Sequence, residues 1–245
     1  MDTLRDIVIV LVPMILSLTV HEFAHAWSAH LLGDDTAARE GRMTLNPAAH
    51  IDPIGTLAVP IIATMFSGFA LIGWAKPVPI SPYRFRRSVS MRKGMILTAL
   101  AGPGSNIALA LIVGLLCVLV LSAPLDAIME HGAPSRILAL MAIADTDNME
   151  LLINMGIADK WTAIIGLLLS RLFVMNLGLA IFNMIPVSPL DGSRLLPEHW
   201  QAVMMQHRMF IFMGLLLAIN FMGSAMWTPI SVLGDGILNM WSMIF

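Results

Sequence analysis

The stretch SLTVHEFAHAW, residues Ser17–Trp27, places two histidines and a glutamate inside an apolar segment. The uncharged run 7–20 leads into it, and a long run of this kind predicts a transmembrane helix. Residues four apart on a helix share one face, so His21 and His25 can bind the same metal ion. With Glu22 between them they form His-Glu-x-x-His, the pattern of zinc peptidases whose glutamate is the general base. The alternative is a pair of structural histidines in a helix bundle.

The composition is typical of a protein that lies mostly within a membrane. Of 245 residues, 58% are hydrophobic and 12% are charged, roughly half the charged share of a soluble domain. We therefore predict an all-α polytopic membrane protein, with one membrane-embedded domain over residues 1–245, a core at 5–194 and C-terminal helices at 205–245. The net charge of −2 argues against nucleic acid as a partner. The single cysteine, Cys117, excludes an intrachain disulfide.

Apolar runs predict about five to six transmembrane helices. The strong candidates are residues 5–32, 94–123, 164–186, 209–226 and 229–245. Loop 75–93 contains six basic residues and no acidic one, whereas loop 124–160 contains six acidic and two basic residues. The positive-inside rule places the first loop in the cytoplasm and the second outside. Within the outer loop, residues 137–157 are expected to form a helix on the membrane surface. The N-terminus lacks the features of a cleavable signal peptide, so the first span is expected to be retained.

A catalytic zinc ion needs a third protein ligand and one open position. Asp191 follows Pro186 and Pro189, which end the helix of span 164–186 and let the chain turn back toward the bundle. The pair Asp191-Gly192 is also a common turn sequence, so spacing alone does not decide between a ligand and a turn residue. The full set of candidates by residue type is His30, Asp34, Asp35, Glu40, His50, Asp52, Asp191, His199 and His207.

Three motifs occur in order along the chain: HEFAH at 21–25, AGPGSN at Ala101–Asn106, and NMIPVSPLDG at Asn183–Gly192. Together they resemble the site-2 protease family of intramembrane zinc metalloproteases. A fourth stretch, NPAAHIDPIGT at Asn46–Thr56, resembles a compact bacterial branch of that family, which lacks a PDZ domain.

The resemblance implies one Zn²⁺ ion per chain, held by His21, His25 and Asp191, with Glu22 as general base. It also implies that Asn106 and Asn183 face the active site. A polar cavity open to the cytoplasm is expected around the metal, lined by Asn46, His50, Asn106 and Asn183. The two asparagines at 106 and 183 are expected to donate to the oxyanion or to the substrate backbone, or else to join helices together.

A common zinc site constrains the topology. His21 lies about 24 Å along the helix from residue 5, and Asp191 follows the far end of span 164–186. Both ends must lie on one side of the membrane, yet spans 94–123 and 164–186 make a full round trip. The apolar segment 54–74 therefore cannot cross completely and is predicted to be re-entrant or interfacial. With loop 75–93 in the cytoplasm, the site faces the cytoplasmic side of the inner membrane.

The function expected from these features is intramembrane endoproteolysis of single-span membrane proteins. The substrate must be unwound and held in an extended form, for which an edge strand at 71–80 (LIGWAKPVPI) is suited, with an irregular loop as the alternative. Two other functions remain open: another class of His-Glu-x-x-His peptidase, and a non-enzymatic metal carrier. The Leu-Asp-Gly motif disfavours the first and Glu22 the second. A homo-oligomer is also left open, and Arg171 within span 164–186 has no assigned role.

Overall fold

The computed structural model describes residues 2–62, 73–143, 146–207, 210–211, 214–215 and 227–244. All regular secondary structure in these ranges is helical. The α-helices are α1 (Asp2–Leu31), α2 (Thr36–Arg39), α4 (Met91–Glu130), α5 (Arg136–Ile143), α6 (Thr146–Asn154), α7 (Lys160–Asn183), α8 (Glu198–Gln206) and α10 (Trp227–Ser242). Short helical turns are η1 (Pro47–Ala49), η2 (Pro53–Ala58), η3 (Pro82–Arg84) and η4 (Asp191–Leu195).

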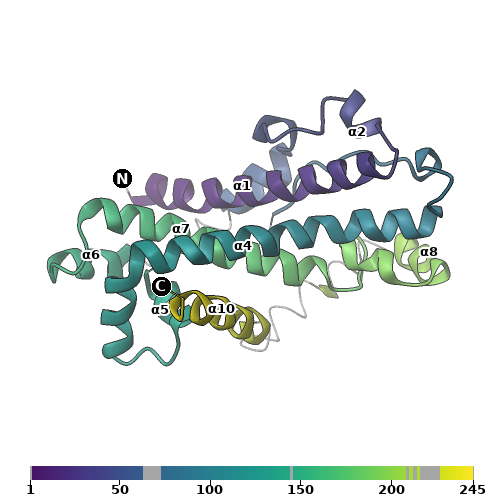
Figure 1. Ribbon diagram of the computed structural model, residues 1–245. Helices are drawn as coiled ribbons and strands as arrows, with labels where there is room; N and C mark the ends of the chain where they lie inside the picture. The colour runs from purple at the N-terminus through teal and green to yellow at the C-terminus, as the bar shows by residue number, and fades with distance from the viewer. Residues whose placement is uncertain are drawn as a thin grey trace.

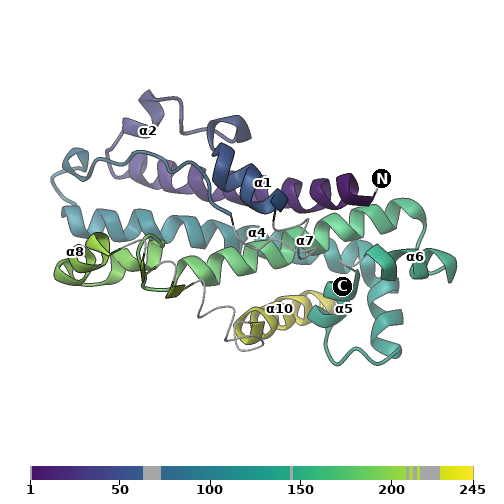
Figure 2. The same cartoon turned by 180° about the vertical axis from the view of Figure 1, so that it is seen from behind.

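The long helices α1, α4 and α7 pack side by side and form the centre of the molecule (Figures 1 and 2). Among the described residues, these three helices are long and apolar enough to span a membrane, over Ile7–Leu31, Met91–Glu130 and Lys160–Asn183. The prediction of a helical protein with membrane character is thus confirmed, but the count of five to six spans is not. The predicted span 209–226 falls largely outside the described residues, and 229–245 corresponds to α10, which has 16 residues.

Helix α4 is longer than the predicted span 94–123 because a proline bends it without ending it. Pro124 removes one backbone donor and crowds the carbonyl four residues earlier. The backbone leaves helical geometry at Leu121, with φ −114° and ψ 17°, and then continues to Glu130. The bend turns the end of α4 toward α5 and α10 (Figure 1).

The predicted surface helix at 137–157 is wrong in one respect, because the structure has two helices here and the first is part of the core. In α5, Ile137, Leu140 and Ile143 are at most 1% exposed and pack in the main apolar cluster. Asp235 of α10 accepts a hydrogen bond from the Ile137 N–H at 2.8 Å, which satisfies a donor at the start of α5. Asp159 similarly accepts from the Thr162 N–H at the start of α7, and this hydrogen bond holds the pKa of Asp159 below its ordinary value.

The two ends of the apolar segment 54–74 are hydrogen-bonded to each other. The Trp74 N–H donates to the Gly55 carbonyl at 3.2 Å, and the Thr56 hydroxyl donates to the Trp74 carbonyl at 2.8 Å. A Cβ on Gly55 would overlap the Trp74 ring, so only glycine permits this approach. A single crossing would separate the two ends by roughly 30 Å. The two described ends of the segment therefore lie side by side, and residues 63–72 between them lie outside the described part.

Residues 73–81, here called the strap, return from this segment across the end of α1. The N–H groups of Lys76 and Val78 donate to the His50 carbonyl at 2.9 Å and to the Glu22 carboxylate at 2.9 Å. Arg42 also donates to the Lys76 carbonyl at 2.7 Å. The predicted edge strand is not formed in the described residues 73–80, because these partners are loop carbonyls and side chains, not a neighbouring strand.

Candidate metal centre

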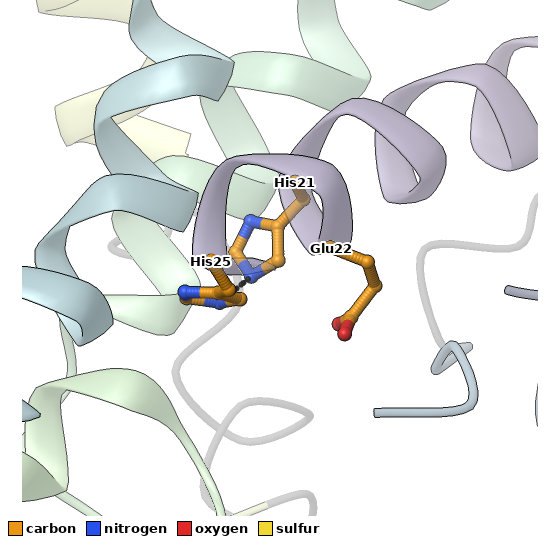
Figure 3. A group of neighbouring side chains, drawn as sticks. All are labelled: His21, Glu22 and His25. Carbon is orange, nitrogen blue, oxygen red and sulfur yellow. Dashed lines mark hydrogen bonds between the residues drawn. The ribbon is translucent and has the colours of Figure 1, made fainter. Parts of the chain in front are cut away.

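Helix α1 carries His21, Glu22 and His25 on adjacent positions of one turn (Figure 3). All three side chains are buried, and their candidate ligand atoms lie within 4.8 Å of one another. The two imidazoles are closest, with their Nε2 atoms 3.0 Å apart. The predicted helical spacing of four residues thus brings both rings to one point.

Asp191 reaches the same point from the other side of the bundle. Its Oδ2 atom lies 3.1 Å from the His21 Nε2 and 3.2 Å from the His25 Nε2. The approach depends on Gly192, because a Cβ there would overlap the Met184 carbonyl oxygen and lie 2.6 Å from that of Ile185. Glycine therefore lets η4 fold tightly against the end of α7, which directs the preceding carboxylate toward α1. Of the candidates for a third ligand, Asp191 is the one placed against both histidines.

In both histidines the proton is on Nδ1, the ring nitrogen that faces away from Asp191. His25 Nδ1 lies 2.7 Å from the Thr98 carbonyl oxygen of α4, which can only accept, so this nitrogen carries the proton. His21 Nδ1 lies 2.6 Å from the Asn106 Oδ1, also an acceptor. Each neutral imidazole carries a proton on one nitrogen only, so both Nε2 atoms present lone pairs toward Asp191.

Three acceptor atoms that face one another without a proton between them require a cation. Asp191 brings a carboxylate oxygen to this point, next to both imidazole nitrogens. Its buried Oδ2 makes no hydrogen bond within the described part of the chain. Two imidazoles and a carboxylate are a donor set of catalytic zinc sites.

The spacing of the three atoms also fits a zinc ion. Tetrahedral zinc with bonds of about 2.0–2.1 Å places its ligand atoms roughly 3.3–3.4 Å apart. The observed separations of 3.0, 3.1 and 3.2 Å are slightly smaller than this value. A small outward movement of the side chains would be enough to admit the ion, with a fourth position left open.

Glu22 is held apart from the three candidate ligands by the strap. Its Oε2 accepts a hydrogen bond from the Val78 N–H at 2.9 Å, and the pair is buried. This contact fixes one carboxylate oxygen, Oε2, and Oε1 is the other oxygen of the group. A carboxylate beside the metal ligands, oriented by a backbone donor, is placed as a general base would need to be.

Asn106 contacts a metal ligand and joins helices, whereas Asn183 bonds within its own helix. Asn106 is fully buried, and its amide group donates to the Ser17 carbonyl at 3.3 Å and to the Asn176 Oδ1 at 2.7 Å. It therefore supports His21 from behind and has no donor left for a substrate. Asn183 donates to the Leu179 carbonyl of its own helix at 3.0 Å. No hydrogen bond within the described ranges joins Asn183 to the histidines, Glu22 or Asp191.

Asn46 and His50, two of the four residues predicted to line a cavity, make hydrogen bonds within their own loop. Asn46 is exposed and caps η1 by accepting from the Ala48 N–H at 3.1 Å. His50 is buried, and its Nε2 donates to the Thr44 carbonyl at 2.8 Å. Both residues shape the loop that supports the strap.

Other candidates for the third ligand also have local partners. Asp34 accepts from the Ser81 N–H at 2.6 Å, and Asp35 pairs with Arg84 at 3.1 Å, which joins the end of α1 to the end of the strap. Asp52 caps η2. These carboxylates organise the loops around the site.

Sequence reasoning missed Asn176, Thr98 and Val78. Asn176 is a buried amide within an apolar helix, and such a residue is costly in a membrane unless it has partners, which is a signal that could have identified it. Thr98 and Val78 act through backbone atoms, for which the sequence carries no side-chain signal.

The site combines a His-Glu-x-x-His helix with an aspartate from a distant part of the chain, and this combination is typical of zinc metalloproteases. The family model "Peptidase family M50" matches residues 9–223, and the chain belongs to that family. This match confirms the resemblance to site-2 proteases.

Two relatives align with this chain, one over most of its length and the other over about half. The chain is 33% identical to "Putative zinc metalloprotease YwhC" of Bacillus subtilis over 240 residues, which is 96% of this chain and 91% of that protein. It is 32% identical over 125 residues to "Putative zinc metalloprotease Rip2" of Mycobacterium tuberculosis, covering 51% of this chain and 45% of that protein. No solved structure matches the chain at a significant level.

Proposed function

We propose that this M50 metalloprotease is an intramembrane endopeptidase that cleaves single-span membrane proteins in or near their transmembrane segments. The observation that carries the proposal is the position of the site. His21, Glu22 and His25 lie inside the apolar span Ile7–Leu31, with His21 about 15 Å before the end of that helix. Against a hydrocarbon core of roughly 30 Å, such a site lies well below the membrane surface.

His21, His25 and Asp191 would hold the zinc ion. Zinc supplies the Lewis acidity that makes water a nucleophile near neutral pH. Glu22 would accept the proton of the attacking water at Oε1 and then deliver it to the leaving amine. The Val78 N–H holds the other oxygen of Glu22 throughout, so the base keeps its orientation while its protonation state changes.

The strap is suited to hold an unwound substrate. The N–H groups of Trp74, Lys76 and Val78 all donate into the protein, as alternate residues of an extended segment do. The opposite edge carries the Ala75 N–H, whereas Pro77 and Pro79 have none and the Pro77 carbonyl accepts from Arg42 at 3.3 Å. An extended peptide would therefore pair there mainly through the N–H and carbonyl of Ala75.

The charge distribution favours a site toward the cytoplasm of the inner membrane. The basic loop 75–93 is joined to the end of α1 by the Arg86 N–H, which donates to the Leu32 carbonyl at 2.8 Å. The metal-ligand end of α1 and the basic loop therefore lie at one end of the bundle, and the positive-inside rule places that end in the cytoplasm.

The experiment that tests the proposal compares membranes containing the active protein with membranes containing Glu22→Gln. Mass spectrometry of the two samples searches for new peptide termini within predicted spans of single-span proteins. We expect such termini only with the active protein, while purified Glu22→Gln keeps one zinc ion per chain. Termini confined to soluble loops, or equal cleavage by Glu22→Gln, would contradict the proposal.

A further inference from the structure

A buried set of hydrogen bonds behind His21 connects all three long helices. It consists of His21 and Ser17 on α1, Asn106 on α4 and Asn176 on α7, here called the asparagine relay. Ser17, Asn106 and Asn176 are each fully buried, with 0% of their surface exposed. Buried amides and hydroxyls are costly unless every donor and acceptor is paired, so the orientation of each group is strongly determined.

The partners of Asn176 fix the orientation of its side-chain amide. Its Nδ2 donates to the Leu172 carbonyl at 2.8 Å and to the Ser17 Oγ at 2.9 Å. The Leu172 carbonyl can only accept, and the Ser17 hydroxyl has already donated its proton to the Pro13 carbonyl at 2.7 Å. Neither partner can donate to Asn176, so its amide cannot be reversed, and its Oδ1 must point toward Asn106.

The orientation of the Asn106 amide follows from that of Asn176. Asn106 must present its Nδ2 to the Asn176 Oδ1 at 2.7 Å, and its second proton goes to the Ser17 carbonyl at 3.3 Å. The Asn106 Oδ1 is thereby directed to His21 Nδ1 at 2.6 Å. An acceptor at this position keeps the proton on Nδ1 and leaves the Nε2 lone pair facing Asp191.

We propose that Asn176 is a positioning residue that acts through Asn106 to fix the tautomer and orientation of His21 as a zinc ligand. His25 needs no such relay, because its Nδ1 donates directly to a main-chain carbonyl that cannot be reversed. The amide of Asn106 could turn over, and Asn176 opposes this through the shorter of the two hydrogen bonds that Asn106 donates, 2.7 Å against 3.3 Å to the Ser17 carbonyl. The inference rests on the proposed zinc site, but not on the choice of substrate.

A purely structural role for the relay would join the three helices without affecting the metal. Interhelical hydrogen bonds of this kind contribute modestly to the stability of a membrane bundle. Loss of a partner of a metal-ligating histidine typically lowers metal affinity about 10- to 100-fold. Zinc affinity, measured on folded protein, therefore separates the two roles.

The test measures the zinc Kd by competition with a chelator, on the folded, monodisperse fraction of protein purified in detergent. We expect Asn176→Leu to weaken zinc binding about 10-fold and Asn106→Leu about 10- to 100-fold. The double variant should bind zinc no more weakly than Asn106→Leu, because Asn176 acts through Asn106. Asn106→Asp keeps an acceptor for His21 but loses the two donors, so it should bind zinc more tightly than Asn106→Leu and more weakly than the wild-type protein.

Leu177→Ala is the matched control, since Leu177 is the next residue of α7 and is fully buried in the apolar core. It should lower the thermal midpoint and leave the zinc Kd unchanged. The relay would be overturned if Asn176→Leu bound zinc with wild-type affinity. It would also be overturned if the two single-variant losses of zinc affinity multiplied in the double variant, or if Leu177→Ala lost as much zinc affinity as Asn176→Leu. If Asn176→Leu does not fold, the zinc Kd values of Asn106→Asp and Asn106→Leu are compared. An equal loss of zinc affinity in both variants would overturn the relay. Wild-type protein without zinc would overturn the proposed function itself.

Discussion

Gly102 of α4 lies directly against His25 of α1. A Cβ built on Gly102 would overlap the His25 Nε2 and lie 2.6 Å from the His21 Cε1. The glycine is buried, and it lies four residues after Thr98, whose carbonyl holds His25. Helix α4 can therefore approach the two metal-binding imidazoles only because this position has no side chain.

The Gly102→Ala variant should accordingly lose zinc. The added methyl group has to displace His25, and the movement separates the His25 Nε2 from the His21 Nε2 and the Asp191 Oδ2. We expect metal analysis of the purified variant to find less than one tenth of the wild-type zinc, roughly the change that a lost ligand orientation produces. Gly104→Ala is the control on the same helix, since nothing lies within 4 Å of a Cβ there. Full zinc content in Gly102→Ala would show that the approach of α4 does not matter.

The hydrogen bond from Val78 to Glu22 predicts a backbone-specific effect on cleavage. Val78→Pro removes the N–H, whereas Val78→Ala keeps it and removes only side-chain atoms. Hydrogen bonds to charged groups contribute about 1.5–3 kcal/mol, so kcat should fall about 10- to 100-fold in Val78→Pro.

Zinc content should not change in either Val78 variant, because the Val78 N–H donates to Glu22, which is not one of the three candidate ligands. Val78→Ala should retain most of its activity in the same assay. An equal loss of kcat in both variants would mean that the valine side chain, and not the donor to Glu22, is what matters.

The contacts between residues 32–35 and 81–86 predict that Glu40 and Tyr83 lie on the same side of the membrane. Both are exposed, and the only native cysteine, Cys117, is buried, so single cysteines can be added to the natural chain. In intact cells, a membrane-impermeant thiol reagent should fail to label Glu40→Cys and Tyr83→Cys and should label Trp161→Cys, which is exposed at the opposite end of the bundle. Labelling of only one of the first two positions would show that segment 54–74 crosses the membrane.

Much of the site follows from local sequence. His21, Glu22 and His25 share one helix turn, so their spacing alone predicts that they meet. The apolar runs likewise predict α1, α4 and α7, since their character depends on residues that lie close together in the chain. Asp191 could be placed only through the resemblance to a family, because no local rule links a carboxylate after α7 with α1.

The parts that sequence reasoning missed depend on contacts between distant segments. The strap has strand-like spacing, but Val78 finds its partner 56 residues away on Glu22 and so forms no sheet. Helix α5 was expected on the surface because its buried partners on α4, α7 and α10 are not visible in its own sequence. Asn106 was expected to face the substrate, and only the position of Asn176 shows why its amide points the other way.

The most direct test of the account is an anomalous difference map recorded at the zinc absorption edge from crystals of the purified protein. The account predicts one strong peak, about 2.0–2.2 Å from the Nε2 atoms of His21 and His25 and from a carboxylate oxygen of Asp191. The Asp191→Ala protein should show a weaker peak or none. A wild-type map without a peak between these three residues, or with the ion bound elsewhere, would contradict the central claim.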